Sequence, residues 1–261
     1  MTKRDIYIIP DPANLSESVR ISQQFNTGFE YNDFFMPQLL DNETELRARI
    51  DLYKSLNRLK GRDNLHGVFF DICLNSIDSK IKQISEMRMR SSMEIASELA
   101  CKGVIFHTNI IQGFETKSYL DGWVEANAAF YRKLCREYSD MNIYVENMFD
   151  YAPYMLRKLA EEMSDVENFG VCYDVAHGHV HDISMGEWIQ ELGPYIRHMH
   201  INDNDGRVDL HQPVGSGTIN WDSFFELIEN VDAKAGILIE VNGANKQEES
   251  LAFLKEKGFL E

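Results

Sequence analysis

The chain has 261 residues, of which 44% are hydrophobic, and it carries a formal net charge of −16 at neutral pH. This length and composition are typical of a globular protein with a substantial core. Because nucleic-acid binding requires clustered lysine and arginine, the acidic balance speaks against a broad polyanion-binding face. The sequence contains no run of about eighteen apolar residues, so we expect no membrane span.

The N-terminal segment and the cysteines indicate in which cellular compartment the protein is expected. The opening segment, MTKRDIYIIPDP, is soon broken by proline and lacks the apolar stretch and cleavage site of a signal peptide. The cysteines are scattered without CxxC spacing, and each lies in or beside an apolar segment, which predicts reduced thiols. They are Cys73, Cys101, Cys135 and Cys172. We therefore expect a cytoplasmic protein.

Short apolar, β-branched or aromatic runs recur at near-regular intervals and predict eight strands. They occupy residues 5–10, 27–31, 64–70, 103–109, 142–147, 169–175, 196–202 and 236–242. Apolar residues three and four apart predict helices between them, most clearly at 88–99, 123–138 and 221–228. Eight such alternations without a flexible linker predict an α/β fold, a single (β/α)₈ TIM barrel over residues 1–261. A doubly wound open sheet is the alternative, although no GxGxxG follows the first run.

In such a barrel, functional residues lie at the carboxyl ends of the strands. Six of the eight predicted strands end in a side chain that can bind a metal: His66, His107, Glu146, Asp174, His200 and Glu240. The last four come from consecutive strands, so we expect them to face one point on the barrel axis. Three carboxylates and one imidazole suit Mn²⁺, Mg²⁺ or Co²⁺, with Zn²⁺ an alternative. Without a cation, these carboxylates would repel one another.

A histidine-rich segment, DVAHGHVH (174–181), follows the sixth predicted strand. Its His177 is expected in a loop above the barrel, where it binds a second metal or a substrate oxygen. His198 precedes His200 by two residues on the same strand face, so we expect it to support His200.

A polar turn follows the seventh predicted strand and leads to Asp209 and His211. At this spacing an extended chain points both side chains the same way, and with His177 they form a plausible zinc-binding set. A solvated loop is the alternative. Arg207 in the same turn offers a planar cation that suits an anionic or polyhydroxyl substrate.

Several segments together resemble a known family. YVEN, YDVAHGH, HMHINDNDGRVDLH, VGSGTINW and ILIEV look like the xylose-isomerase-like TIM-barrel superfamily, which contains sugar (phosphate) isomerases and epimerases and also endonuclease IV. The resemblance covers essentially the whole chain and is clearest from the third predicted strand onward. For the isomerase/epimerase branch it implies metal ligands at Glu146, Asp174, His200 and Glu240. It also implies that His177 contacts the substrate and that Arg207 stands at or near the position of a substrate-binding arginine of the family.

The endonuclease IV pattern can be placed on the chain as well. Nine residues match its three-metal site: His66, His107, Glu146, Asp174, His177, His200, Asp209, His211 and Glu240. Sugar-type relatives resemble some of the same segments, so these matches do not separate the two branches. The acidic charge and the lack of basic, aromatic-rich insertions speak against a protein that bends DNA.

We therefore expect a divalent-metal-dependent sugar or sugar phosphate isomerase/epimerase that transfers a proton through a metal-stabilised enediolate. Glu146 and Glu240 would form the acid/base pair, and His66 and His107 would line the opposite wall as hydrogen-bond donors or ligands of a further metal. The alternatives are an endonuclease IV-like phosphodiesterase with a multinuclear zinc site and a non-catalytic sugar- or metal-binding barrel. The expected partner is a small sugar, not nucleic acid or membrane, and the sequence leaves open whether the chain forms a homo-oligomer.

Overall fold

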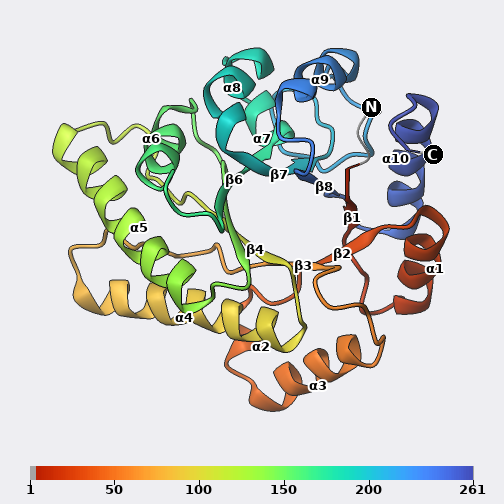
Figure 1. The fold of residues 1–261 in the computed structure, drawn as a ribbon, viewed down its shortest axis with the longest axis horizontal. Coiled ribbons are helices and arrows are strands. Elements are labelled where there is room, and N and C mark those ends of the chain that lie inside the picture. The colour runs from red at the N-terminus through yellow and green to blue at the C-terminus, as the bar shows by residue number, and fades with distance from the viewer. Residues whose placement is uncertain (1–3, 261) are drawn as a thin grey trace. The chain divides into compact units, whose positions relative to one another are not determined.

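The computed structural model describes residues 4–260 and confirms the predicted α/β barrel (Figure 1). Its eight strands follow chain order around a closed barrel, β1 to β8. Each predicted strand segment contains one observed strand. The strands are β1 (Ile6–Ile8), β2 (Gly28–Tyr31), β3 (Asn64–His66), β4 (Gly103–His107), β5 (Asn142–Glu146), β6 (Phe169–Asp174), β7 (Ile196–Ile201) and β8 (Gly236–Ile239).

Helices connect the strands, and the three segments predicted from apolar spacing overlap α4, α5 and α9, each running one residue past the observed end. The α-helices are α1 (Leu15–Phe25), α2 (Pro37–Leu40), α3 (Glu43–Lys54), α4 (Ser79–Glu98), α5 (Lys117–Glu137), α6 (Tyr154–Glu162), α7 (Val175–His179), α8 (Met185–Leu192), α9 (Trp221–Leu227) and α10 (Ala244–Glu256). Two 3₁₀ turns, η1 (Gly193–Tyr195) and η2 (Ile228–Asn230), extend α8 and α9. Short helices such as α2 and α7 have too few residues to give a readable apolar period, so sequence patterning missed them.

The described chain divides by its internal contacts into two compact units. Unit 1 holds the residues up to Glu30, Glu146–Arg157 and those from Val171 onward, and unit 2 holds Tyr31–Val145 and Lys158–Gly170. That the whole chain acts as one domain stays a prediction.

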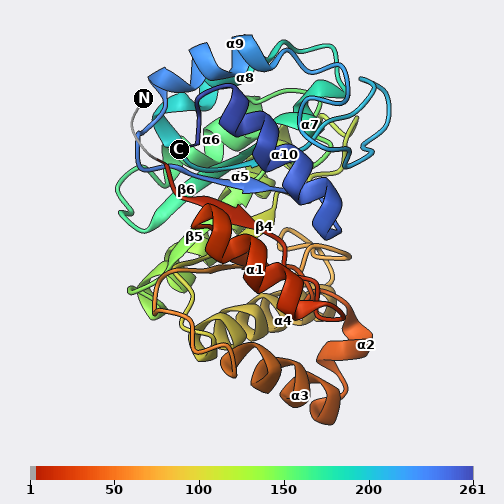
Figure 2. The same ribbon diagram turned by 90° about the vertical axis from the view of Figure 1, so that its right-hand side faces the viewer.

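In unit 1, strands β6, β7, β8 and β1 pair in parallel. Asp174 of β6 lies directly opposite His200 of β7 in this register, and Cys172 lies opposite His198. On the outside, α1 and α10 lie side by side, as both views show (Figures 1 and 2). The parallel register therefore brings chemically active residues of neighbouring strands to the same level.

In unit 2, β3 pairs in parallel with β4, with His66 opposite Ile105. The buried Trp123 of α5 donates from its indole nitrogen to the carbonyl oxygen of Thr108, 3.2 Å away. Asp78 caps α4 by accepting a hydrogen bond from the backbone of Lys80 at 2.8 Å, as expected for a residue that begins a helix.

The structure also describes the state of the cysteines and the apolar character of the helices. Cys101, Cys135 and Cys172 are buried, Cys73 is partly exposed, and all four are free thiols. Among residues 4–260, no helix combines the length and the apolar character needed to cross a bilayer.

Candidate metal centre

Four strand-end residues of unit 1 converge in the structure. Glu146 ends β5, Asp174 ends β6, His200 is the penultimate residue of β7, and Glu240 directly follows β8. One potential ligand atom from each lies within 4.8 Å of the others. We call these four residues the strand-end cluster.

His200 lies at the centre of this cluster. Its Nδ1 is 3.1 Å from Oε2 of Glu146 and 3.6 Å from Oε2 of Glu240. Glu146, Asp174 and His200 are completely buried, and Glu240 is only 6% exposed. Burying three carboxylates beside one imidazole is costly unless their charge is compensated.

Asn147, the residue after β5, fixes the backbone of Asp174. Its amide oxygen accepts from the Asp174 nitrogen at 2.8 Å, and its amide nitrogen donates to the Asp174 oxygen at 2.9 Å. Asp174 in turn caps α7, because its Oδ1 accepts from the backbone nitrogen of His177 at 2.6 Å. One asparagine thereby ties the ends of β5 and β6 to the helix that carries His177.

The electrostatics of the cluster follow from burial and crowding. Burial raises the pKa of Asp174 well above its usual value, and the charges of Glu240 and Glu146 add to this effect. At Glu240, burial also acts to raise the pKa, but the neighbouring charge of His200 outweighs it and holds the pKa at about 2. A divalent cation would remove the repulsion that makes Asp174 hard to ionise.

The donor set fits a divalent cation. Oδ2 of Asp174 and Oε2 of Glu240 are buried and accept no hydrogen bond from any residue of the described chain. Ligand atoms around a cation at about 2.1 Å lie within roughly 4.2 Å of one another, so only a small contraction separates the cluster from a coordination sphere. Buried acceptors of this kind are rarely left without a partner in native proteins.

A second group in unit 1 consists of His177, Asp209 and His211, which we call the loop cluster; its potential ligand atoms also lie within 4.8 Å of one another. Oδ2 of Asp209 is 2.9 Å from Nε2 of His211 and 3.4 Å from Nε2 of His177. Oδ1 of Asp209 is buried and accepts no hydrogen bond within residues 4–260. Two imidazoles and a carboxylate form a set that zinc accepts.

Two details of the loop cluster differ from the sequence-based expectation. His177 was expected in a loop, but it lies in the short helix α7 because Asp174 caps that helix. His211 adopts a left-handed backbone conformation with φ of 45°, so Asp209 and His211 do not meet through an extended chain. The Nδ1–H of His211 instead donates to the backbone oxygen of Glu240 at 2.8 Å, which links the loop cluster to the strand-end cluster.

Asp203 holds the loop that carries Asp209 and His211. Its side-chain oxygens accept from four donors at 2.7 to 3.2 Å: the backbone nitrogens of Asn204, Gly215 and Ile219 and the indole nitrogen of Trp221. The backbone nitrogen of each of Asp203 and Gln212 donates to the backbone oxygen of the other, both at 2.9 Å. A fully buried carboxylate thus closes the loop at its base.

Of the remaining predicted site residues, His66 and His107 belong to unit 2 and Arg207 belongs to a loop of unit 1. In unit 2, Nε2 of His66 is 3.1 Å from Nε2 of His107, and the ring of Phe69 packs against His107 with centroids 4.6 Å apart. Arg207 is exposed at the tip of the loop closed by Asp203, where its backbone nitrogen donates to Asp205. The assignment of His66, His107 and Arg207 to substrate or metal binding stays a prediction.

Sequence reasoning missed three residues of the site: Glu30, Asn147 and Asp203. Glu30 of β2 is completely buried, and its carboxylate contacts both His198 and His200. A glutamate inside the strand-forming run GFEY was the available signal, because an isolated charge is rarely buried without a partner. Asn147 is the last residue of the predicted strand segment 142–147 and Asp203 directly follows the segment 196–202, and only three-dimensional contacts reveal their roles.

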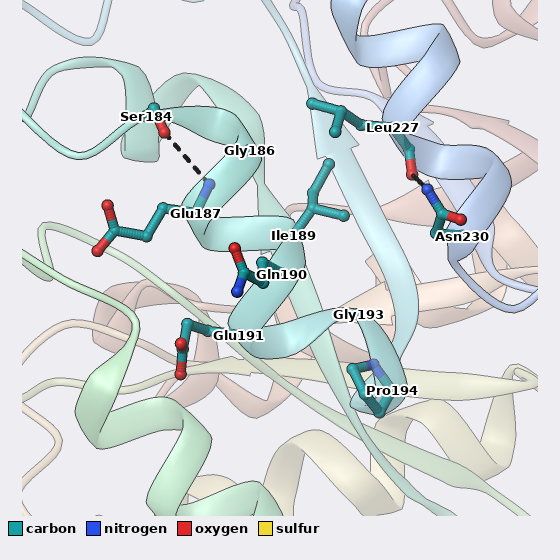
Figure 3. Close-up of a pocket in the computed structure, with 10 residues that line it drawn as sticks. All are labelled: Ser184, Gly186, Glu187, Ile189, Gln190, Glu191, Gly193, Pro194, Leu227 and Asn230. Atoms are coloured by element: carbon teal, nitrogen blue, oxygen red, sulfur yellow. Dashed lines mark hydrogen bonds between the residues drawn. The ribbon is translucent and has the colours of Figure 1, made fainter.

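The surface also has a groove of about 900 Å³, which is lined by other residues than those of the two clusters. It is bounded by α8 with η1 and by α9 with η2. In its lining, the hydroxyl oxygen of Ser184 accepts a hydrogen bond from the backbone nitrogen of Glu187, and the side-chain amide of Asn230 donates one to the backbone oxygen of Leu227 (Figure 3). None of its lining residues belongs to either cluster, so the groove offers no convergent chemistry.

Comparison with known proteins agrees with this architecture. The model of the xylose isomerase-like TIM barrel family matches residues 25–257. The chain belongs to this family. A curated relative, the probable endonuclease 4 of Protochlamydia amoebophila, is 26% identical over 156 residues, which are 51% of this chain and 54% of that protein.

Two solved structures share the fold over almost the whole chain. The TTHB071 protein from Thermus thermophilus, soaked with ZnCl₂, is 25% identical with a TM-score of 0.75, covering 98% of this chain and 97% of that one. A D-tagatose 3-epimerase-like protein is 20% identical with a TM-score of 0.75, covering 96% of each chain. The name of one of these structures indicates an epimerase-like protein, whereas the name of the curated relative indicates an endonuclease.

Proposed function

We propose that the protein is a divalent-metal-dependent isomerase or epimerase of a small sugar or sugar phosphate. The observation that carries the proposal is the strand-end cluster, in which two buried glutamates from β5 and from the end of β8 lie within 4.8 Å of the same imidazole and aspartate ligand atoms. The bound cation, Mn²⁺, Mg²⁺, Co²⁺ or Zn²⁺, would polarise the carbonyl and hydroxyl oxygens of the substrate.

The chain's own residues then have separate tasks. Glu146 and Glu240 approach from different strands, so one carboxylate takes the proton from the carbon beside the carbonyl and the other returns one. Asp174 and His200 complete the cation's coordination. The pKa of Glu240, held at about 2, means that this carboxylate is ionised at neutral pH, the form that would bind a cation.

The substrate-binding assignments rest on position. His177 lies beside Glu146, with Nδ1 3.3 Å from Oε1 of that residue, and its other ring nitrogen faces Asp209. Because the Nδ1–H of His177 donates to the backbone oxygen of Asn147 at 2.8 Å, His177 would contact a sugar oxygen through Nε2. Arg207, His66 and His107 are also proposed to contact the substrate.

Solvent isotope exchange tests this proposal directly. The purified protein, loaded in turn with each of the four cations, is incubated in D₂O with a panel of ketoses, aldoses and their phosphates. An isomerase or epimerase incorporates deuterium at the carbon beside the carbonyl and produces a stereoisomer or aldose–ketose pair. Absence of both exchange and product with every cation and sugar would count against the proposal.

A second candidate function is a phosphodiesterase with a multinuclear zinc site, and the loop cluster specifically favours it. A proton-transfer enzyme with one cation has no need of His177, Asp209 and His211 as a further ligand set. Elemental analysis of the purified protein and incubation with duplex DNA containing an abasic site separate the two. Three zinc ions per chain with strand cleavage, and no isotope exchange, would reverse the ranking.

A further inference from the structure

Glu30 forms a buried contact that neither candidate reaction uses directly. Its Oε1 lies 2.9 Å from Nε2 of His200, and its Oε2 lies 2.9 Å from Nε2 of His198. Glu30 and His200 are completely inaccessible, and His198 is 1% exposed. Oε2 of Glu30 shares a hydrogen bond with His198 and Oε1 lies in ion-pair contact with His200, so both imidazoles help to compensate the cost of burying this carboxylate.

The contact to Glu30 assigns different roles to the two nitrogens of His200. Nε2 faces the carboxylate of Glu30, whereas Nδ1 faces Glu146 and Glu240. A neutral imidazole carries one proton, and the hydrogen bond made by one nitrogen decides which nitrogen is free to bind a cation. With its proton held on Nε2 by Glu30, His200 presents the lone pair of Nδ1 to the strand-end cluster.

His198 holds Glu30 in place from the level below. It lies two residues before His200 on β7, directly opposite Cys172 of β6. The ring of Tyr7 packs edge-on against it with centroids 5.4 Å apart. Gly236 of β8 leaves room for the imidazole, because a Cβ at that position would lie 3.0 Å from Nδ1 of His198.

We propose that Glu30 is a positioning residue that fixes the orientation and tautomer of His200, so that Nδ1 is the metal-binding nitrogen, and that His198 anchors Glu30. The inference rests on the metal site of the proposed function but is independent of the substrate. Potential ligand atoms of Cys172, His198 and His200 also lie within 4.8 Å of one another at the lower level. His200 also belongs to the strand-end cluster, so this group shares a ligand with that cluster and is not independent of it.

The experiment compares zinc affinity in the wild-type protein and in the Glu30→Gln variant, measured by competition with a chromophoric chelator. Glutamine keeps the shape but removes the charge and can offer an acceptor to only one imidazole. We expect the affinity to fall about 10- to 100-fold, as for other residues that orient metal ligands.

Asp63→Asn is a matched control. Asp63 is a buried carboxylate of unit 2 that accepts from Tyr31 at 2.9 Å and from Arg58 at 2.6 Å, and it belongs to neither cluster. This variant is expected to lower the melting temperature and leave the zinc affinity unchanged. A purely structural role for Glu30 would give the same pattern in Glu30→Gln and would overturn the proposal.

A measurement on the unaltered chain covers the case in which Glu30→Gln does not fold. The ¹⁵N shifts of His200 in the zinc-loaded wild-type protein report which nitrogen binds the metal and which carries the proton. Zinc on Nδ1 with a proton on Nε2 is the expected result, and zinc on Nε2 would overturn the proposal. Failure of the wild-type protein to bind any of the four cations would instead remove the proposed function, and this inference with it.

Discussion

The strand-end cluster and the loop cluster contain similar side chains but are built in different ways. Glu146, Asp174 and His200 lie on three strands whose spacing is set by backbone pairing. Asp209 and His211 instead lie on a loop whose shape depends on one aspartate, Asp203, and on a left-handed residue. The first arrangement depends on strand pairing, whereas we expect the second to depend on Asp203, a residue outside the loop cluster.

The largest expected effect tests the rigid cluster. Glu146→Gln or Glu240→Gln should reduce turnover about 100- to 10,000-fold, because each variant removes one member of the acid/base pair. Circular dichroism and thermal melting should show that the fold persists. Isotope exchange that survives in both variants would refute the assignment of the pair.

The next effect tests the support of the loop. In the wild-type protein, four donors bond to the buried carboxylate of Asp203. Asp203→Asn replaces this carboxylate with an amide, whose NH₂ group cannot accept from them, and should lower the free energy of unfolding by about 3 kcal/mol. The loop cluster should lose its cation while the strand-end cluster keeps one. Urea denaturation and elemental analysis measure both effects. Asp205→Asn, an exposed substitution in the same loop, is the control and should retain the wild-type metal content.

A smaller and more local effect is expected for His211→Gln. Loss of a direct ligand should weaken cation binding at the loop cluster by at least about 10- to 100-fold, the range found even for indirect support of a metal ligand. In an isomerase, isotope exchange should persist, because the acid/base pair remains. In a phosphodiesterase, hydrolysis should be lost, so this variant also separates the two candidate functions.

The smallest effect is expected for Arg207→Ala. Arg207 is exposed, so the free energy of unfolding should change by no more than about 0.5 kcal/mol. If the guanidinium binds an anionic substrate, KM for a sugar phosphate should rise while KM for the unphosphorylated sugar stays constant. Equal KM changes for both substrates would contradict this role.

The sequence was sufficient to predict the barrel and the composition of the strand-end cluster. Parallel strands with buried faces give continuous apolar runs, and a polar side chain at the end of such a run is conspicuous. Glu146, Asp174 and His200 could therefore be placed near one another without coordinates. Their convergence needs only the closed order of the strands.

The rest depended on contacts that sequence spacing does not encode. Glu30 meets His198 and His200 across a separation of about 170 residues, and its partners could not be inferred from β2 alone. His177 lies in a helix because Asp174 supplies a cap, which competes with the loop conformation that the short segment also permits. The left-handed backbone of His211 contradicts the preference of most side chains and is maintained by its neighbours.

The closure of one loop at Asp203 has a consequence for how the protein can diversify. Because Asp203 and Gln212 pair at the base, the loop between them is already closed, and doubling its length would cost only about 0.6 kcal/mol of chain entropy. Arg207, Val208 and Leu210 at the tip of this loop are exposed. Insertions and substitutions there can change what the protein recognises while Asp203 and the strand ends stay as they are.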